Sequence, residues 1–96
     1  MVKGNISLIE RFQRWDENNP EVYELFKRFT FEAIAAGRKK SSAWLIVNRI
    51  RWETSVVTKG EDFKISNDFI ALYSRKFMND FTNHAGFFVT KITQRF

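Results

Sequence analysis

The sequence predicts a mainly helical α+β fold, with about four helices and a small antiparallel sheet of two to three strands. Apolar residues recur at helical spacing in four separate segments. Valine, threonine and phenylalanine cluster around a glycine between the third and fourth segments, and again near the C-terminal end, as in short strands. The 96 residues, 44% hydrophobic and 17% aromatic, suffice for one core, so residues 1–96 are expected to form a single domain.

The first two helices are expected over residues 5–16 and from about residue 20 to 36. Each segment has an apolar stripe with charged residues on its other side. Asn19 can accept a hydrogen bond from the first turn of the second helix, and Pro20 needs no donor at the first helical position. Gly37 can take the left-handed conformation that often ends a helix. The second helix therefore has both ends marked.

The third helix lies within a basic stretch, residues 38–52, which holds five basic residues, two tryptophans and no acid. Ser41 or Ser42 can cap this helix, which is expected to run to about Glu53. Its inward residues are expected to be Ala43, Val47 and Ile50. The basic residues of the stretch are then expected to lie in the loop before this helix and on its other faces.

Strands are expected after this helix. Residues 56–58 and 63–65 are rich in β-branched and aromatic residues, and Gly60 lies in the turn between them, as in a hairpin. Two strands alone are marginally stable in water. Residues 87–92 provide a third strand, which completes the predicted sheet.

The fourth helix is expected to start at Ser66 or Asn67 and to run to about Phe81. With the hairpin, these elements are the parts of a winged helix-turn-helix. About a dozen residues separate the third and fourth helices, however, whereas a helix-turn-helix uses a turn of three or four. The likeness to a winged helix is therefore loose.

The charge is unevenly distributed along the chain. Residues 1–37 hold five basic and six acidic side chains, whereas residues 38–96 hold eleven basic and five acidic ones, and the whole chain carries +5. Clustered lysine and arginine with a pI of 9.8 are typical of nucleic-acid-binding proteins. Two alternatives remain. The charged surface can serve only solubility, or Arg49 or Arg51 can pair with Glu53 or with acids of the preceding helix.

The candidate nucleic-acid-binding residues are basic or amide side chains of the second part of the chain. They are Arg38, Lys39, Lys40, Asn48, Arg49, Arg51, Lys64, Asn67, Arg75 and Lys76. The cations can contact phosphates, with a salt-dependent gain in binding for each phosphate neutralised. Asn67 can reach a base edge from the start of the fourth helix, or serve only as its cap.

Catalysis has almost no support in the sequence. His84 is the only histidine and falls in a predicted turn, and no cysteine is present. The sequence contains no HExxH, GxxxxGK[ST] or GxSxG motif. We therefore expect no enzyme activity, metal or cofactor. No apolar run approaches the roughly 18 residues that a membrane span needs, so a cytoplasmic protein is expected.

Four motifs carry a resemblance to a group of proteins. They are Asn19-Pro20-x-Val22-Tyr23, Ile50-Arg51-Trp52, the run from Asp62 to Asn67, and Tyr73-Ser74-Arg75-Lys76. Together they make residues 8–92 similar to small uncharacterised proteins of bacteriophages and prophages, which usually have Ala-Arg-Lys where this chain has Ser74-Arg75-Lys76. The resemblance implies a phage or prophage origin and action in the host cytoplasm.

Small phage proteins of this size are often DNA-binding regulators or inhibitors of host systems such as CRISPR complexes. We therefore expect a regulatory protein that binds nucleic acid, with duplex DNA favoured. The alternative is an anti-CRISPR-like inhibitor that binds a host protein or ribonucleoprotein. Exposed aromatic residues, among them Trp15, Trp44 and Trp52, would favour that alternative, and a homodimer could cover the same surface.

Overall fold

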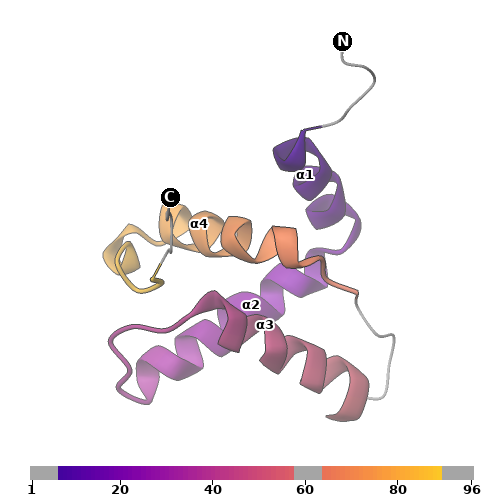
Figure 1. The fold of residues 1–96 in the computed structure, drawn as a ribbon. Coiled ribbons are helices and arrows are strands. Elements are labelled where there is room, and N and C mark those ends of the chain that lie inside the picture. Colours follow the sequence, from indigo (N-terminus) through magenta and orange to yellow (C-terminus); the bar gives the residue numbers. More distant parts are fainter. Residues whose placement is uncertain (1–6, 58–63, 90–96) are drawn as a thin grey trace.

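Four α-helices build the fold within residues 7–57 and 64–89, the parts of the chain that this computed structural model describes (Figure 1). The helices are α1 (Leu8–Asn18), α2 (Pro20–Ala35), α3 (Ala43–Trp52) and α4 (Ile70–Asp80). A π-helical turn, Glu53–Val57, extends α3, and short 3-10 turns cover Asn67–Phe69 and Thr82–His84. In Figure 1, α4 lies across α2 and α3. Helix α1 leads directly into α2 and is inclined to it.

The helix ends follow the predicted capping chemistry only in part. Asn19, expected to accept a hydrogen bond from the first turn of α2, makes no side-chain cap bond, and its Nδ2 instead donates to Trp15 O at 3.0 Å. Ser7 and Glu10 form a capping box at α1: Ser7 Oγ accepts from Glu10 N at 3.1 Å, and Ser7 N donates to Glu10 Oε1 at 3.2 Å. Ser42, rather than Ser41, caps α3, because its Oγ accepts from Leu45 N at 3.2 Å. Pro20 occupies the first turn of α2 as predicted.

Gly37 ends α2 in the left-handed conformation that the sequence predicts, with φ of +100°. Gly37 N donates to Ile34 O at 3.0 Å, and Arg38 N donates to Ala33 O at 3.1 Å. This pair of bonds satisfies two carbonyls at the helix end, as in a Schellman motif. The backbone direction at the start of the following basic segment is thereby fixed.

The core is built largely from aromatic rings around α2 and α4. Phe26, Tyr73 and Phe77 are completely buried. The ring of Phe26 lies 5.4 Å from that of Tyr73 and 5.4 Å from that of Phe88, so it joins α2 to α4 and to the segment after α4. Each such ring adds roughly 1.5–3 kcal/mol through burial alone, which explains how a chain this short can fold without disulfides.

The predicted antiparallel sheet is wrong for the residues that can be described. Residues 56 and 57 continue α3 in its π-helical turn, and residues 64–66 form no strand. The only β contact within 7–57 and 64–89 is one isolated parallel bridge between Ser41 and Phe88. The predicted turn at Gly60 and residues 90–92 lie outside the described residues. The described part is therefore all-helical and has no wing, so the α+β, winged-helix-like prediction fails there.

Local contacts explain why helix replaces strand. Thr54 is buried, and its Oγ1 donates to Ile50 O at 3.0 Å, which favours continuation of the helix that ends there. The carbonyl of Ile65 accepts from Arg51 Nη2 at 2.7 Å, so a side chain satisfies it in place of a neighbouring strand. The β preference of valine and threonine is weak and yields to such contacts.

Within 7–57 and 64–89, no helix combines the length and the apolar character that crossing a membrane requires.

Candidate nucleic-acid interface

Arg38, Lys39 and Lys40 form a loop that the fold holds at both ends, called the basic loop below. Its start is fixed by the Schellman motif at Gly37. Its end is fixed at Ser41, whose N donates to Phe87 O at 3.0 Å and whose carbonyl accepts from Val89 N at 3.3 Å. Because both anchors are backbone contacts, the loop has little conformational freedom to lose when it binds a ligand.

The three cations of the basic loop face solvent. Arg38 Nε donates to Lys40 O at 3.1 Å, which orders the arginine without neutralising it. Among the described residues, no carboxylate forms an ion pair with any of the three. The loop also follows the C-terminal end of α2, whose partial negative charge favours nearby cations. The loop therefore offers its positive charge to an external anion.

A pocket of about 360 Å³ opens beside the basic loop, between the end of α2 and the turn after α4. Its lining residues are Ile34, Arg38, Lys39, Asn83, His84, Gly86 and Phe87. Arg38 and Lys39 supply charged donors, Asn83 and His84 supply polar groups, and Ile34 and Phe87 add apolar lining. His84 is fixed by an edge-on contact with Phe31, with the ring centroids 5.7 Å apart. This combination suits a phosphate group.

Arg49 and Lys76, both predicted to bind nucleic acid, are engaged within the protein. Arg49 Nη1 lies 2.8 Å from Glu53 Oε1, and its guanidinium carbon lies 4.4 Å from the Phe29 ring centroid. Lys76 pairs with Asp16 and sits 4.2 Å from the Tyr23 ring centroid. For these two cations, the structure favours the internal role that the sequence left open for Arg49.

Arg51, Asn48 and Asn67 form one hydrogen-bonded group. Arg51 Nη1 donates to Asn48 Oδ1 at 3.0 Å, and Arg51 Nη2 donates to Asn67 Oδ1 at 3.1 Å. With its bond to the carbonyl of Ile65, Arg51 ties the segment before α4 to α3. Ser66 provides the cap, since its Oγ accepts from Asp68 N at 3.2 Å. Asn67 is therefore a tether rather than the cap.

Lys64 and Arg75 are exposed, and Lys64 does not extend the basic loop into one continuous surface. Residues 64–66 precede α4, whereas the basic loop contacts the segment that follows α4, and Figure 1 shows these two segments at opposite ends of that helix. The eleven residues of α4 separate its ends by roughly 16 Å. Of the ten predicted residues, the structure thus gathers Arg38, Lys39 and Lys40 in the basic loop. Three others, Asn48, Arg51 and Asn67, form a separate hydrogen-bonded group.

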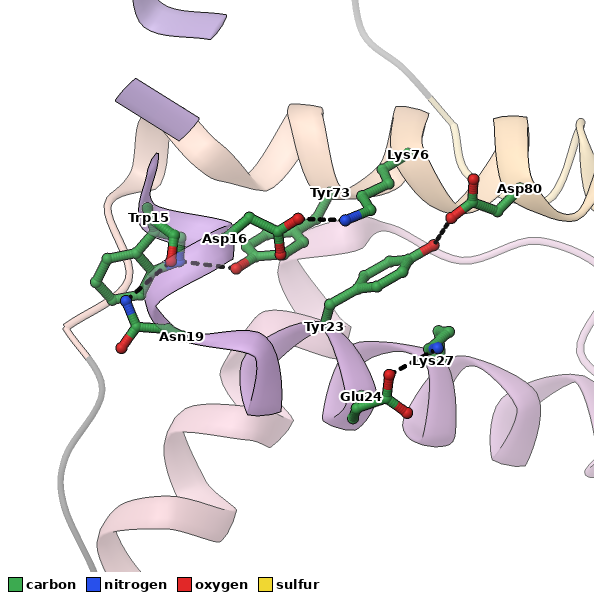
Figure 2. A network of polar contacts seen from close by, with 9 residues as sticks. All are labelled: Trp15, Asp16, Asn19, Tyr23, Glu24, Lys27, Tyr73, Lys76 and Asp80. Carbon is green, nitrogen blue, oxygen red and sulfur yellow. Dashed lines mark hydrogen bonds and ion pairs between the residues drawn. The ribbon is translucent and has the colours of Figure 1, made fainter. Parts of the chain in front are cut away.

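A polar network joins α1, α2 and α4 (Figure 2). Trp15 Nε1 donates to Tyr73 OH at 2.7 Å, and Tyr23 OH donates to Asp80 Oδ2 at 2.6 Å. Burial raises the pKa of Tyr23, and the bond to Asp80 raises it further. Burial also raises the pKa of Tyr73, against the opposing effect of the bond from Trp15. Both hydroxyls stay protonated at neutral pH and serve as structural groups.

Asn83 and His84 are the site residues that the sequence did not predict. They join Arg38 and Lys39 only because residues 41 and 88 pair across the fold, and no local pattern announces that pairing. Within 7–57 and 64–89, the His, Asp and Glu side chains form no group of three that could hold a metal ion.

Comparison of the chain with models of protein families, with curated proteins and with solved structures finds no match.

Proposed function

We propose that the protein is a regulatory protein that binds nucleic acid, with duplex DNA as the favoured ligand, through phosphate contacts made by the basic loop. One observation carries the proposal: three consecutive cations stand on an anchored loop and form no ion pair with any carboxylate of the described chain. The regulatory role in a host cell is proposed from the expected phage or prophage origin alone.

The pocket supports phosphate as the group that is recognised. Arg38 can present a planar fork of donors to phosphate oxygens, and Lys39, which also lines the pocket, can add a point charge. Asn83 and His84 line the same pocket and can donate hydrogen bonds. Contacts of this kind fix a protein on the nucleic-acid backbone and carry little sequence information. Binding should therefore be strong in low salt and weakly selective for sequence.

Fluorescence anisotropy with labelled nucleic acids tests the proposal. The full chain is titrated into a 20-base-pair duplex, a single-stranded DNA and a single-stranded RNA, each at 50 mM and 200 mM NaCl. We expect saturable binding to the duplex at the lower salt concentration and clear weakening at the higher one. Absence of binding to all three at 50 mM NaCl would refute a nucleic-acid function. Binding to RNA alone would refute the DNA assignment.

A further inference from the structure

The pocket beside the basic loop takes up only two of the three cations of that loop. Arg38 and Lys39 line the pocket, whereas Lys40 does not. Arg38 Nε donates to Lys40 O at 3.1 Å, which leaves its two Nη groups for a ligand. No carboxylate of the described chain lines the pocket. Two positive charges therefore share one recess, and the third lies outside it.

Backbone hydrogen bonds hold the walls of this pocket together. Ile34 belongs to the last turn of α2, and Phe87 follows α4. The bond of 3.0 Å from Ser41 N to Phe87 O joins the end of the basic loop to the segment after α4. On the α2 side, Gly37 N and Arg38 N donate to two of the last carbonyls of the helix, which lessens their repulsion of an anion. The pocket is thus formed before a ligand arrives.

The charge of the pocket matches a terminal phosphate better than a phosphate within a strand. A phosphate within a nucleic-acid strand is a diester with about one negative charge. A terminal phosphate is a monoester, which carries about −1.5 to −2 at pH 7. Arg38 and Lys39 together balance the monoester, whereas a single diester would leave one of the two cations without a counter-charge.

The pocket also has room for the sugar that a terminal phosphate carries. Its volume of about 360 Å³ lies near the lower end of the roughly 300–1,000 Å³ found for small-molecule sites. Ile34 and Phe87 add apolar lining. Gly86 lines the pocket without a side chain, and a Cβ added there would meet no atom within 4 Å. These dimensions suit the phosphate and sugar of one nucleotide.

We propose that the pocket binds the terminal phosphate monoester of a phosphorylated nucleic-acid strand, with Arg38 and Lys39 as its cationic donors. Asn83 and His84 add hydrogen bonds to the same phosphate, and Lys40 contacts the next phosphate along the strand. This inference rests on the proposed nucleic-acid function and adds recognition of the strand end. Nucleic acid with phosphorylated ends should therefore bind more tightly than the same nucleic acid with hydroxyl ends.

Fluorescence anisotropy of the full chain at 100 mM NaCl compares two internally labelled 20-base-pair duplexes of one sequence, with either phosphate or hydroxyl at all four strand ends. Lys39→Gln and Lys40→Gln form a matched pair, because each removes one charge from the basic loop but only Lys39 lines the pocket. We expect the unchanged protein to bind the phosphorylated duplex about tenfold more tightly, the effect of one further hydrogen bond between charged groups. Lys40→Gln should keep this preference, and Lys39→Gln should lose most of it.

Two results of this comparison would overturn the terminal-phosphate site. One is equal affinity of the unchanged protein for the two duplexes, and the other is the same preference in both variants. Because the protein still binds a duplex in either case, the proposed nucleic-acid function would stand while this inference fails.

Nuclear magnetic resonance with a small ligand tests the pocket without a duplex. Deoxyadenosine 5′-monophosphate is titrated into the isotope-labelled full chain, with deoxyadenosine and inorganic phosphate as comparison ligands. We expect the monophosphate to shift the backbone amide of Gly86 and the side-chain amide of Asn83, deoxyadenosine to shift neither, and inorganic phosphate to bind more weakly. Absence of any shift with the monophosphate, or equal affinity for inorganic phosphate, would overturn the proposal, whatever the protein's affinity for duplex DNA.

Discussion

Alkaline pH should destabilise this protein through its two tyrosines. Tyr23 and Tyr73 are 7% and 0% exposed, and burial raises the pKa of each well above the ordinary value near 10. Above pH 10 the unfolded chain loses both phenolic protons while the folded chain keeps them. The stabilisation is therefore complete below pH 10 and is lost as the pH rises further.

The size of this effect follows from the linkage between proton binding and folding. One pH unit above the unfolded pKa, each protected tyrosine lowers the free energy of unfolding by about 1.4 kcal/mol, and the pair lowers it by about 3 kcal/mol. A typical small domain has only about 5–15 kcal/mol in total. The change from pH 9 to pH 11 should therefore be visible as a clear fall in the urea midpoint.

The assay is a pH titration followed by tyrosinate absorbance at 295 nm and by far-UV circular dichroism. The chain has two tyrosines, so the increase due to tyrosinate, measured above the baseline of the three tryptophans, reports on Tyr23 and Tyr73. We expect absorbance and loss of helix to rise together in one transition above pH 10. In Tyr23→Phe, the fall in unfolding free energy from pH 9 to pH 11 should be about half as large. Ionisation near pH 10 in a protein that keeps its native helical signal would refute this reasoning.

Three further substitutions test the fold. Arg51→Ala removes two hydrogen bonds that tether the segment before α4, to Ile65 O and Asn67 Oδ1, and one to Asn48 within α3. It should lower the free energy of unfolding by about 1–3 kcal/mol in urea denaturation; an unchanged midpoint would contradict the tether. The Cβ that Gly37→Ala adds meets no atom within 4 Å. The substitution should therefore lower the free energy of unfolding only by the backbone strain of positive φ, about 1 kcal/mol. Thermal unfolding measures this loss, with Ala36→Gly for comparison. Phe26→Ala leaves a cavity beside three rings and should cost about 3–5 kcal/mol; a loss under 1 kcal/mol would argue against the described core.

The helices could be predicted from the sequence because their signals are local. Each has an apolar stripe at helical spacing, and Ser42, Pro20 and Gly37 mark helix ends through contacts within a few residues. The sheet prediction failed because it depended on the weak β preference of residues such as Val56 and Val57. In the structure, Arg51 satisfies the carbonyl of Ile65, which a strand partner would otherwise have paired. The hydroxyl of Thr54 bonds back to Ile50 O within α3, and Val56 and Val57 continue that helix in its π-helical turn.

The candidate site was only partly predictable, because charge pairing depends on distant residues. The cations of the basic loop could be identified from their run in the sequence. Lys76 looked equivalent to them, yet its partner Asp16 lies 60 positions earlier in the chain. Asn83 and His84 reach the basic loop only through the bridge between residues 41 and 88. No local pattern reveals such long-range contacts.

The salt dependence of duplex binding tests the role of the basic loop most directly. The salt dependence is measured for two triple variants. The loop variant replaces Arg38, Lys39 and Lys40 by Gln. The control variant replaces Arg11, Arg14 and Arg28 by Gln. Both lower the net charge by three, and the control residues are exposed on α1 and α2. The slope of log Kobs against log salt should become shallower by about 2.7 in the loop variant and stay nearly unchanged in the control. Equal slopes in the two variants would contradict phosphate binding by the basic loop.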